Sequence, residues 1–194
     1  MTIEELQNIP IILGSQSPRR KELLASLDLK FEVVHPNVEE TISAEVPIAS
    51  VAEEIAKKKL TAFSDTSYQD RVVITADTVV VDQAGNVLGK PKDFEEAFAV
   101  LKGLSGKEHV VYTGVAIAYQ GNTISFSNKT LVKFATLDDL EIRYYLDRYK
   151  PYDKAGSYGI QEWIGRIGID YIEGSFENVV GLPTSALYQA LKKM

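Results

Sequence analysis

The segment from Val72 to Val81 constrains the fold more than any other part of the chain. It is almost entirely apolar, and its β-branched residues favour a strand over a helix. Because apolar side chains follow one another without alternation, we expect both faces of this strand to be covered. One carboxylate, Asp77, interrupts the apolar run. The segment therefore predicts a buried strand that carries a single acidic side chain.

Strand and helix signals alternate along the rest of the chain. Further strands are predicted at 9–13, 31–34, 87–88, 109–119 and 123–134, and glycine-rich, strand-like sequence fills 156–182. Helices are predicted from Pro18 after an N-cap at Ser17, over 47–63, after capping boxes at Asp93 and Asp138, and after Pro183. The hairpin joined at 120–122 argues against a purely parallel sheet. We expect a single α/β domain spanning residues 1–194, with a mixed, twisted β-sheet flanked by helices.

Composition excludes several classes of function. The chain has 194 residues, enough for one domain. Its formal charge is −6, which disfavours binding to long nucleic acids. It has no cysteine, which excludes disulfides, thiolate zinc sites and cysteine nucleophiles. Neither a secretion signal nor an apolar run of about 20 residues is present, so we expect a cytoplasmic protein with no membrane partner. No Walker A motif occurs.

Asp77 is the first of three sequence features that a purely structural role does not readily explain. Burying an unpaired carboxylate costs several kcal/mol, so such an aspartate is normally paired with a cation, a metal or several hydrogen-bond donors. One hypothesis is a catalytic carboxylate. The alternative is a bulge or strand end at which Asp77 bonds to nearby backbone.

Lys59 is the second feature, because it projects near the middle of the apolar stripe of its predicted helix. A lysine in that position either extends its ammonium to the rim or meets an anion inside the protein. The pattern leaves both alternatives open.

The third feature is the strand-to-helix junction at 15–21, where Arg19, Arg20 and Lys21 lie in or near a first helical turn. Cations there oppose the helix dipole unless an anion is present. With Ser15 and Ser17 beside them, they favour anion binding over a solvated basic patch.

Weaker signals come from three other places. Lys90 lies in a Gly-Lys-Pro turn, and Glu39 and Glu40 could offer carboxylate oxygens to a metal or simply form a surface loop. The segment 156–162 mixes glycines with an aromatic ring and an amide, which suits a wall for a planar base or a structural turn. Several cations with one or two carboxylates fit phosphoryl chemistry on a nucleotide, assisted by Mg²⁺ or Mn²⁺.

The chain resembles the Maf nucleotide pyrophosphatases, a family first named for septum formation. Six segments carry the resemblance in order along the chain: 12–24, 75–79, 89–93, 104–109, 153–161 and 180–183. The resemblance implies two lobes with a central cleft, often a homodimer, a divalent metal, and hydrolysis of nucleoside triphosphates to the monophosphate and pyrophosphate.

The resemblance also implies roles for single residues. Asp77 matches the proton acceptor, and Glu40 matches an acidic residue near the metal. Phosphate-binding positions are matched by Ser15, Arg20, Lys59 and Lys90, and positions linked to base choice by Arg19, Thr78 and Gln161. Gln161 is similar to the branch that acts on dTTP and UTP, and a glutamine amide can both donate to and accept from the uracil edge.

One departure accompanies this match: Glu162 and Trp163 replace the small residues expected after the glutamine. Two other functions remain as alternatives. The first is a nucleotide-binding regulator of cell division with incidental hydrolysis. The second is an RNA-binding module, which the acidic net charge disfavours, so we expect no stable nucleic-acid partner.

Overall fold

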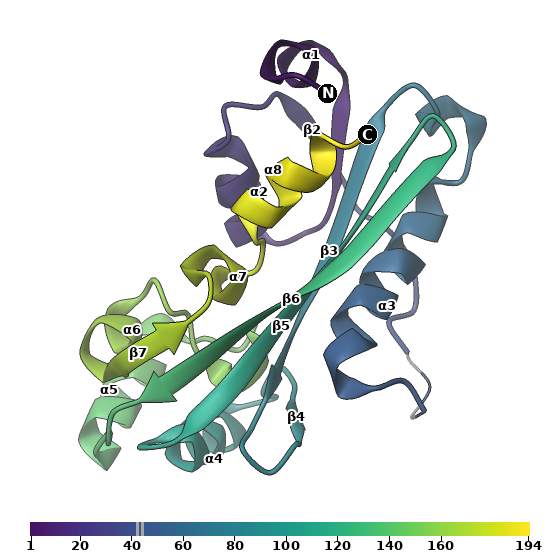
Figure 1. Cartoon of the computed structure of the whole chain (residues 1–194). Helices are drawn as coiled ribbons and strands as arrows, with labels where there is room; N and C mark the ends of the chain where they lie inside the picture. Colours follow the sequence, from purple (N-terminus) through teal and green to yellow (C-terminus); the bar gives the residue numbers. More distant parts are fainter. Residues whose placement is uncertain (42, 44) are drawn as a thin grey trace. The chain divides into compact units, whose positions relative to one another are not determined.

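The computed structural model describes residues 1–41, 43 and 45–194 (Figure 1). The chain divides into two compact units. Unit 1 consists of Met1–Asp77, Thr113–Asn128 and Gly181–Met194, and unit 2 of Thr78–Tyr112 and Lys129–Val180. Three strands contribute residues to both units: β3 (Val72–Val81), β5 (Glu108–Tyr119) and β6 (Asn122–Phe134).

The strands form one mixed sheet in the order β2-β1-β3-β5-β6-β7, with β4 paired to β3. The remaining strands are β1 (Ile11–Gly14), β2 (Phe31–Val34), β4 (Val87–Leu88) and β7 (Ile169–Glu173). β1 pairs in parallel with both β2 and β3. The pairs β3–β4 and β6–β7 are antiparallel. The predicted α/β class with a mixed sheet flanked by helices is confirmed.

In unit 1, alternate residues of the strands face two different groups of helices. One group comprises α1 (Ile3–Asn8), α2 (Pro18–Ala25) and α8 (Thr184–Leu191). Leu24 and Leu187 from this group pack with Leu13 and Ile74. On the other face, Phe63 packs with Val73. Phe63 ends the 3₁₀ turn η1 (Thr61–Phe63), which follows α3 (Ile48–Leu60). The long strand is thus covered on both faces, as its largely apolar sequence predicts.

Two glycines allow the close approach of elements around α3. A Cβ at Gly114 on β5 would lie 2.1 Å from the backbone nitrogen of Glu53 on α3. A Cβ at Gly14 would lie 2.8 Å from the Phe63 ring. Since no side chain fits at either position, glycine lets α3 rest directly on the strands and sets the depth of its buried residues.

Unit 2 has a second hydrophobic core. Its helices are α4 (Phe94–Leu104), α5 (Asp139–Tyr149), η3 (Ala155–Ser157), α6 (Trp163–Gly168) and α7 (Phe176–Val180). Leu101, Phe134 and Tyr145 are fully buried in this core together with Ile164. Each unit therefore buries its own apolar surface.

Most predicted elements are confirmed, with three corrections. The strand prediction over 156–182 is largely wrong, because only Ile169–Glu173 forms a strand there. Tertiary packing overrides β-propensity in this stretch: at Gly165 a Cβ would lie 1.8 Å from the carbonyl oxygen of Ile160, so the chain coils tightly against itself. At α4, Asp93 caps the helix, but the Glu96 carboxylate accepts from the backbone of Lys92 and does not complete a capping box.

The third correction is helix α1, which the sequence reasoning missed although Thr2 and Glu5 form a capping box at its start. The short 3₁₀ turn η2 (Thr66–Tyr68) precedes β3. Across residues 1–41, 43 and 45–194, no helix has the length and apolar character that crossing a membrane requires.

Candidate active site

Asp77 lies in the middle of β3, where side chains alternate between the two faces of the sheet. Thr75, two residues earlier, donates a hydrogen bond of 2.7 Å to the carbonyl oxygen of Ala56 on α3. Asp77 shares that face, and its side chain is 14% exposed. The strand continues through this position to Val81, so the alternative of a strand end at Asp77 is wrong.

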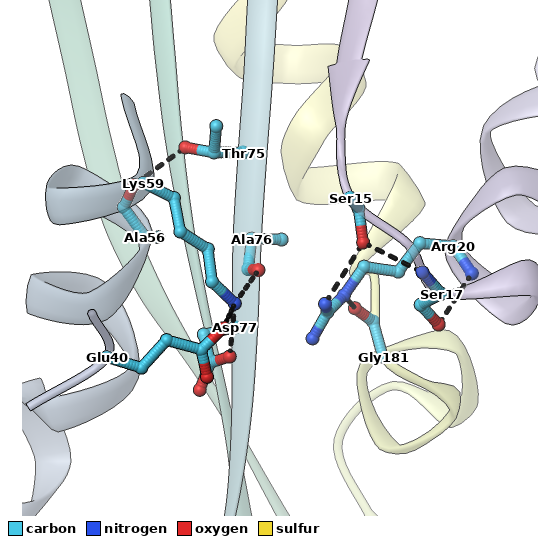
Figure 2. A network of polar contacts seen from close by, with 10 residues as sticks. All are labelled: Ser15, Ser17, Arg20, Glu40, Ala56, Lys59, Thr75, Ala76, Asp77 and Gly181. Carbon is cyan, nitrogen blue, oxygen red and sulfur yellow. Dashed lines mark hydrogen bonds and ion pairs between the residues drawn. The ribbon is translucent and has the colours of Figure 1, made fainter. Parts of the chain in front are cut away.

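Lys59 reaches Asp77 from α3 and is itself buried. Its Nζ lies 2.7 Å from Asp77 Oδ1 and 2.9 Å from Glu40 Oε1 (Figure 2). It also donates to the carbonyl oxygen of Ala76 at 3.5 Å. Of the two alternatives for Lys59, the buried one is correct: the ammonium meets anions inside the protein and does not extend to the rim.

The start of α2 forms a second polar group in unit 1. Arg20 donates from Nη1 to Ser15 Oγ at 3.3 Å and from Nε to the carbonyl oxygen of Gly181 at 2.9 Å (Figure 2). Ser17 caps the helix by accepting from the backbone N–H of Arg20. The predicted N-cap and N-terminal proline of this helix are therefore confirmed.

Electrostatics connect the two groups. Burial lowers the pKa of Arg20 below its ordinary value, and the nearby guanidinium of Arg19 adds to this effect. The carboxylates of Asp77 and Glu40 oppose it. A guanidinium keeps its charge in proteins, so Arg20 is a partly buried cation within electrostatic range of both carboxylates.

Six of the predicted residues therefore gather in unit 1: Ser15, Arg19, Arg20, Glu40, Lys59 and Asp77. They come from the end of β1, the start of α2, the segment before α3, α3 itself and β3. Helix–sheet packing brings them together, because Lys59 is 18 residues from Asp77 along the chain.

The other predicted residues belong to unit 2. Thr78 follows Asp77 on β3, so its side chain points to the opposite face of the sheet. Lys90 is exposed in the connection between β4 and α4. The backbone N–H of Gly156 donates to the carbonyl oxygen of Gly89 at 3.2 Å, which links the Lys90 connection to the segment that carries Gln161.

The donors available for a metal are the carboxylates of Glu40 and Asp77, which contact the same ammonium group. In the part of the chain that the structure describes, no three histidine, cysteine or acidic residues cluster as a ready-made metal site. Two carboxylates suit Mg²⁺ or Mn²⁺ when phosphate oxygens supply further ligands. The residues present thus fit a metal that binds together with a phosphorylated substrate.

Sequence reasoning missed a polar network beside Gln161. Tyr145, which is fully buried, donates to Glu162 Oε2 and accepts from the backbone N–H of Gly159. Lys154 contacts Glu162 Oε1 at 3.2 Å. The unusual acidic residue after Gln161, Glu162, could have indicated this network from the sequence. Nothing in the sequence distinguishes Tyr145 from an ordinary core residue.

Comparison with known proteins finds relatives over nearly the whole chain. Residues 10–194 match the model of the family described as Maf-like protein. A dTTP/UTP pyrophosphatase of Porphyromonas gingivalis is 52% identical over 193 residues, which cover 98% of this chain and 96% of that protein. A dTTP/UTP pyrophosphatase of Phocaeicola vulgatus is 50% identical over 194 residues, covering 99% of this chain and 100% of the relative.

Among solved structures, the Ham1 protein of Staphylococcus aureus has a similar fold. The TM-score is 0.50 at 16% identity, and the match covers 93% of this chain and 99% of the other. At this identity the likeness concerns the fold alone. The family model and the relatives extend over nearly the whole chain, and they show that this protein belongs to the Maf family.

Proposed function

We propose that this protein hydrolyses dTTP and UTP to the nucleoside monophosphate and pyrophosphate. The observation that carries the proposal is the carboxylate of Asp77, held inside an apolar strand by a buried lysine. Such a carboxylate is costly to maintain for structure alone. The names of the relatives supply the substrate class.

In the proposed reaction, water attacks a phosphorus atom of the α–β phosphoanhydride, and the bond between that phosphorus and the bridging oxygen breaks. Asp77 orients the water and accepts its proton, and pyrophosphate leaves from the monophosphate. Ser15, Arg20 and Lys59 bind phosphate oxygens and offset the charge that develops on them, as does Lys90. Arg19 lies beside Arg20 on α2, and together with Thr78 and Gln161 it contributes to the choice of base.

Glu40 and Asp77 would hold a divalent cation, which polarises phosphate oxygens and neutralises their charge. Before substrate binds, the Lys59 ammonium offsets the repulsion between these two carboxylates. Two carboxylates are a small ligand set, so we expect tight Mn²⁺ binding only in the presence of the nucleotide. A homodimer remains a prediction from the family resemblance, and a cytoplasmic location remains a prediction from the sequence.

The first experiment is pyrophosphate release from a panel of nucleoside triphosphates with Mg²⁺ or Mn²⁺ and with excess chelator. We expect release that depends on the metal and is fastest with dTTP and UTP. Faster release from a purine nucleotide would contradict the base assignment and keep the reaction. No release from any nucleotide in the panel would contradict the proposed reaction itself.

A further inference from the structure

Gln161 lies in a four-residue turn whose two ends are tied together. The backbone N–H of Glu162 donates to the carbonyl oxygen of Gly159 at 3.0 Å, which places Ile160 and Gln161 at the centre of the turn. The side chain of Glu162 folds back over Gly159, where an added Cβ would lie 2.8 Å from the carboxylate carbon. Glycine at 159 is thus required for the carboxylate to reach this position.

Tyr145 on α5 closes a ring through both ends of the same turn. The N–H of Gly159 donates to its hydroxyl oxygen at 3.0 Å, and the hydroxyl donates to the carboxylate of Glu162. Burial and the adjacent carboxylate raise the pKa of Tyr145 well above its ordinary value, so the hydroxyl keeps the proton that it donates. Lys154 then balances the charge of Glu162 at 3.2 Å.

A glutamine needs such a support if it is to distinguish one pyrimidine from another. Uracil offers an N–H donor at the centre of its pairing edge, whereas cytosine offers an acceptor there. An amide group can face either base, because a half-turn exchanges its oxygen and nitrogen. Discrimination therefore requires an amide held in one orientation.

The side chain of Gln161 can accept, through its amide oxygen, a hydrogen bond that the described residues do not supply. Its Oε1 atom is buried and lacks a hydrogen-bond partner within the described part of the chain. A buried amide oxygen without a donor is unfavourable, and the N–H of a uracil or thymine ring would supply that donor.

We propose that Tyr145 and Glu162 are positioning residues that hold the Gln161 turn and thereby make the enzyme prefer uracil and thymine over cytosine. This inference rests on the proposed function, in which Gln161 contributes to the choice of base. Neither residue touches substrate in this assignment. They act through the turn: Tyr145 contacts the backbone N–H of Gly159 and the side chain of Glu162, and the backbone N–H of Glu162 closes the turn.

The test is a double-mutant cycle on the ratio of kcat/KM for UTP to that for CTP. Tyr145→Phe removes one oxygen atom and leaves both ends of the turn without their shared partner. We expect the UTP/CTP ratio to fall about tenfold, with most of the change in KM for UTP. Gln161→Ala should lower the ratio by a similar factor, and the double variant should be no worse than Gln161→Ala alone.

Tyr149→Phe is the matched control, since it deletes the same atom one helical turn later. The Tyr149 ring stacks on Tyr145 with centroids 5.1 Å apart, and it lies outside the ring of hydrogen bonds around the turn. Its UTP/CTP ratio should stay within about twofold of the unmodified enzyme. Circular dichroism and thermal melting verify that each variant is folded. If Tyr145→Phe does not fold, Glu162→Gln takes its place, with an expected fall of about threefold because glutamine still accepts from Tyr145.

The outcomes separate this inference from the proposed function. If Gln161→Ala lowers the ratio and the folded Tyr145 or Glu162 variant does not, the positioning role is wrong and the function stands. An equal effect of Tyr145→Phe with and without Gln161 would also overturn the positioning role. If Gln161→Ala leaves the ratio unchanged, Gln161 does not sense the base, and both the base assignment and the inference fail.

Discussion

In each unit of the molecule, a buried lysine lies between two carboxylates. In unit 1, the side chain of Lys59 is 9% exposed and contacts Asp77, at 14%, and Glu40, at 52%. In unit 2, the side chain of Lys154 is 11% exposed and contacts Glu162, at 19%, and Asp153, at 56%. The two ion pairs are thus closely matched in burial and in the exposure of both acidic partners.

The difference lies in what else contacts the less exposed carboxylate of each pair. Glu162 also accepts from the buried hydroxyl of Tyr145, and its own backbone closes a turn. Asp77 projects from a strand toward a lysine on a separate helix, within electrostatic range of the Arg20 guanidinium, which donates a hydrogen bond to Ser15. Similar ion pairs can therefore have either a structural or a catalytic role. In the catalytic role, substrate, water or metal must be able to reach the carboxylate and displace the lysine from it.

Replacing the less exposed carboxylate of each pair, Asp77 or Glu162, by an amide should separate the two units most strongly. Asp77→Asn should lower kcat by a factor of about 10² to 10⁴, the usual contribution of a general base, while Glu162→Gln should leave kcat nearly unchanged. The asparagine oxygen still accepts from Lys59, so stability should change by only about 1–2 kcal/mol. Steady-state kinetics and urea unfolding measure the two effects. Normal turnover by a folded Asp77→Asn protein would contradict the catalytic assignment.

Replacing each lysine by methionine sharpens the comparison. Both changes leave a largely buried carboxylate without its cation, so each should cost about 2–3 kcal/mol of unfolding free energy. Lys59→Met should also reduce kcat about 10²-fold through lost phosphate stabilisation, whereas Lys154→Met should retain kcat and raise KM. Equal kinetic defects in the two variants would show that the functional distinction between the units is mistaken.

Acid should destabilise the protein through His109 in unit 2. Its imidazole is buried, pairs with the Tyr158 hydroxyl at 2.7 Å, and has a pKa lowered to about 4 by desolvation. Between about pH 6.5 and 4 the unfolded chain binds a proton that the folded one does not, so stability falls as the pH falls, by up to about 3 kcal/mol.

Urea unfolding at pH 7 and pH 5 measures this loss. His109→Gln should remove part of the difference between the two pH values, and His35→Gln, at an exposed position, should not. An identical acid response in the His109 variant would assign the sensitivity to other groups.

The smallest effect is expected for the exposed ion pair between Lys102 and Asp139, whose side chains are 54% and 56% exposed. Lys102→Ala should change the unfolding free energy by no more than about 0.5 kcal/mol, because water and salt screen the pair. This variant provides the baseline for both buried lysines. A loss as large as that of Lys154→Met would mean that burial does not explain the cost.

The sequence alone was enough to predict most of the secondary structure and to identify the charged residues in unusual positions. Periodicity and caps predicted the helix from Pro18, the helix over 47–63 and the long strand from Val72, because these signals are local. Asp77 and Lys59 were identifiable as charges in apolar positions for the same reason. The amide of Gln161 came from the family resemblance, and its role remains a prediction.

Only the tertiary structure decided which partners these residues have. Lys59 meets Asp77 because Gly114 lets α3 rest on the sheet, a contact between residues far apart in the sequence. The ring through Tyr145 and Glu162 likewise depends on α5 packing beside a turn that local sequence predicted as strand. Local patterns report which face a residue occupies, but the free energy of burying a charge or a hydroxyl depends on distant groups that packing brings within hydrogen-bond distance.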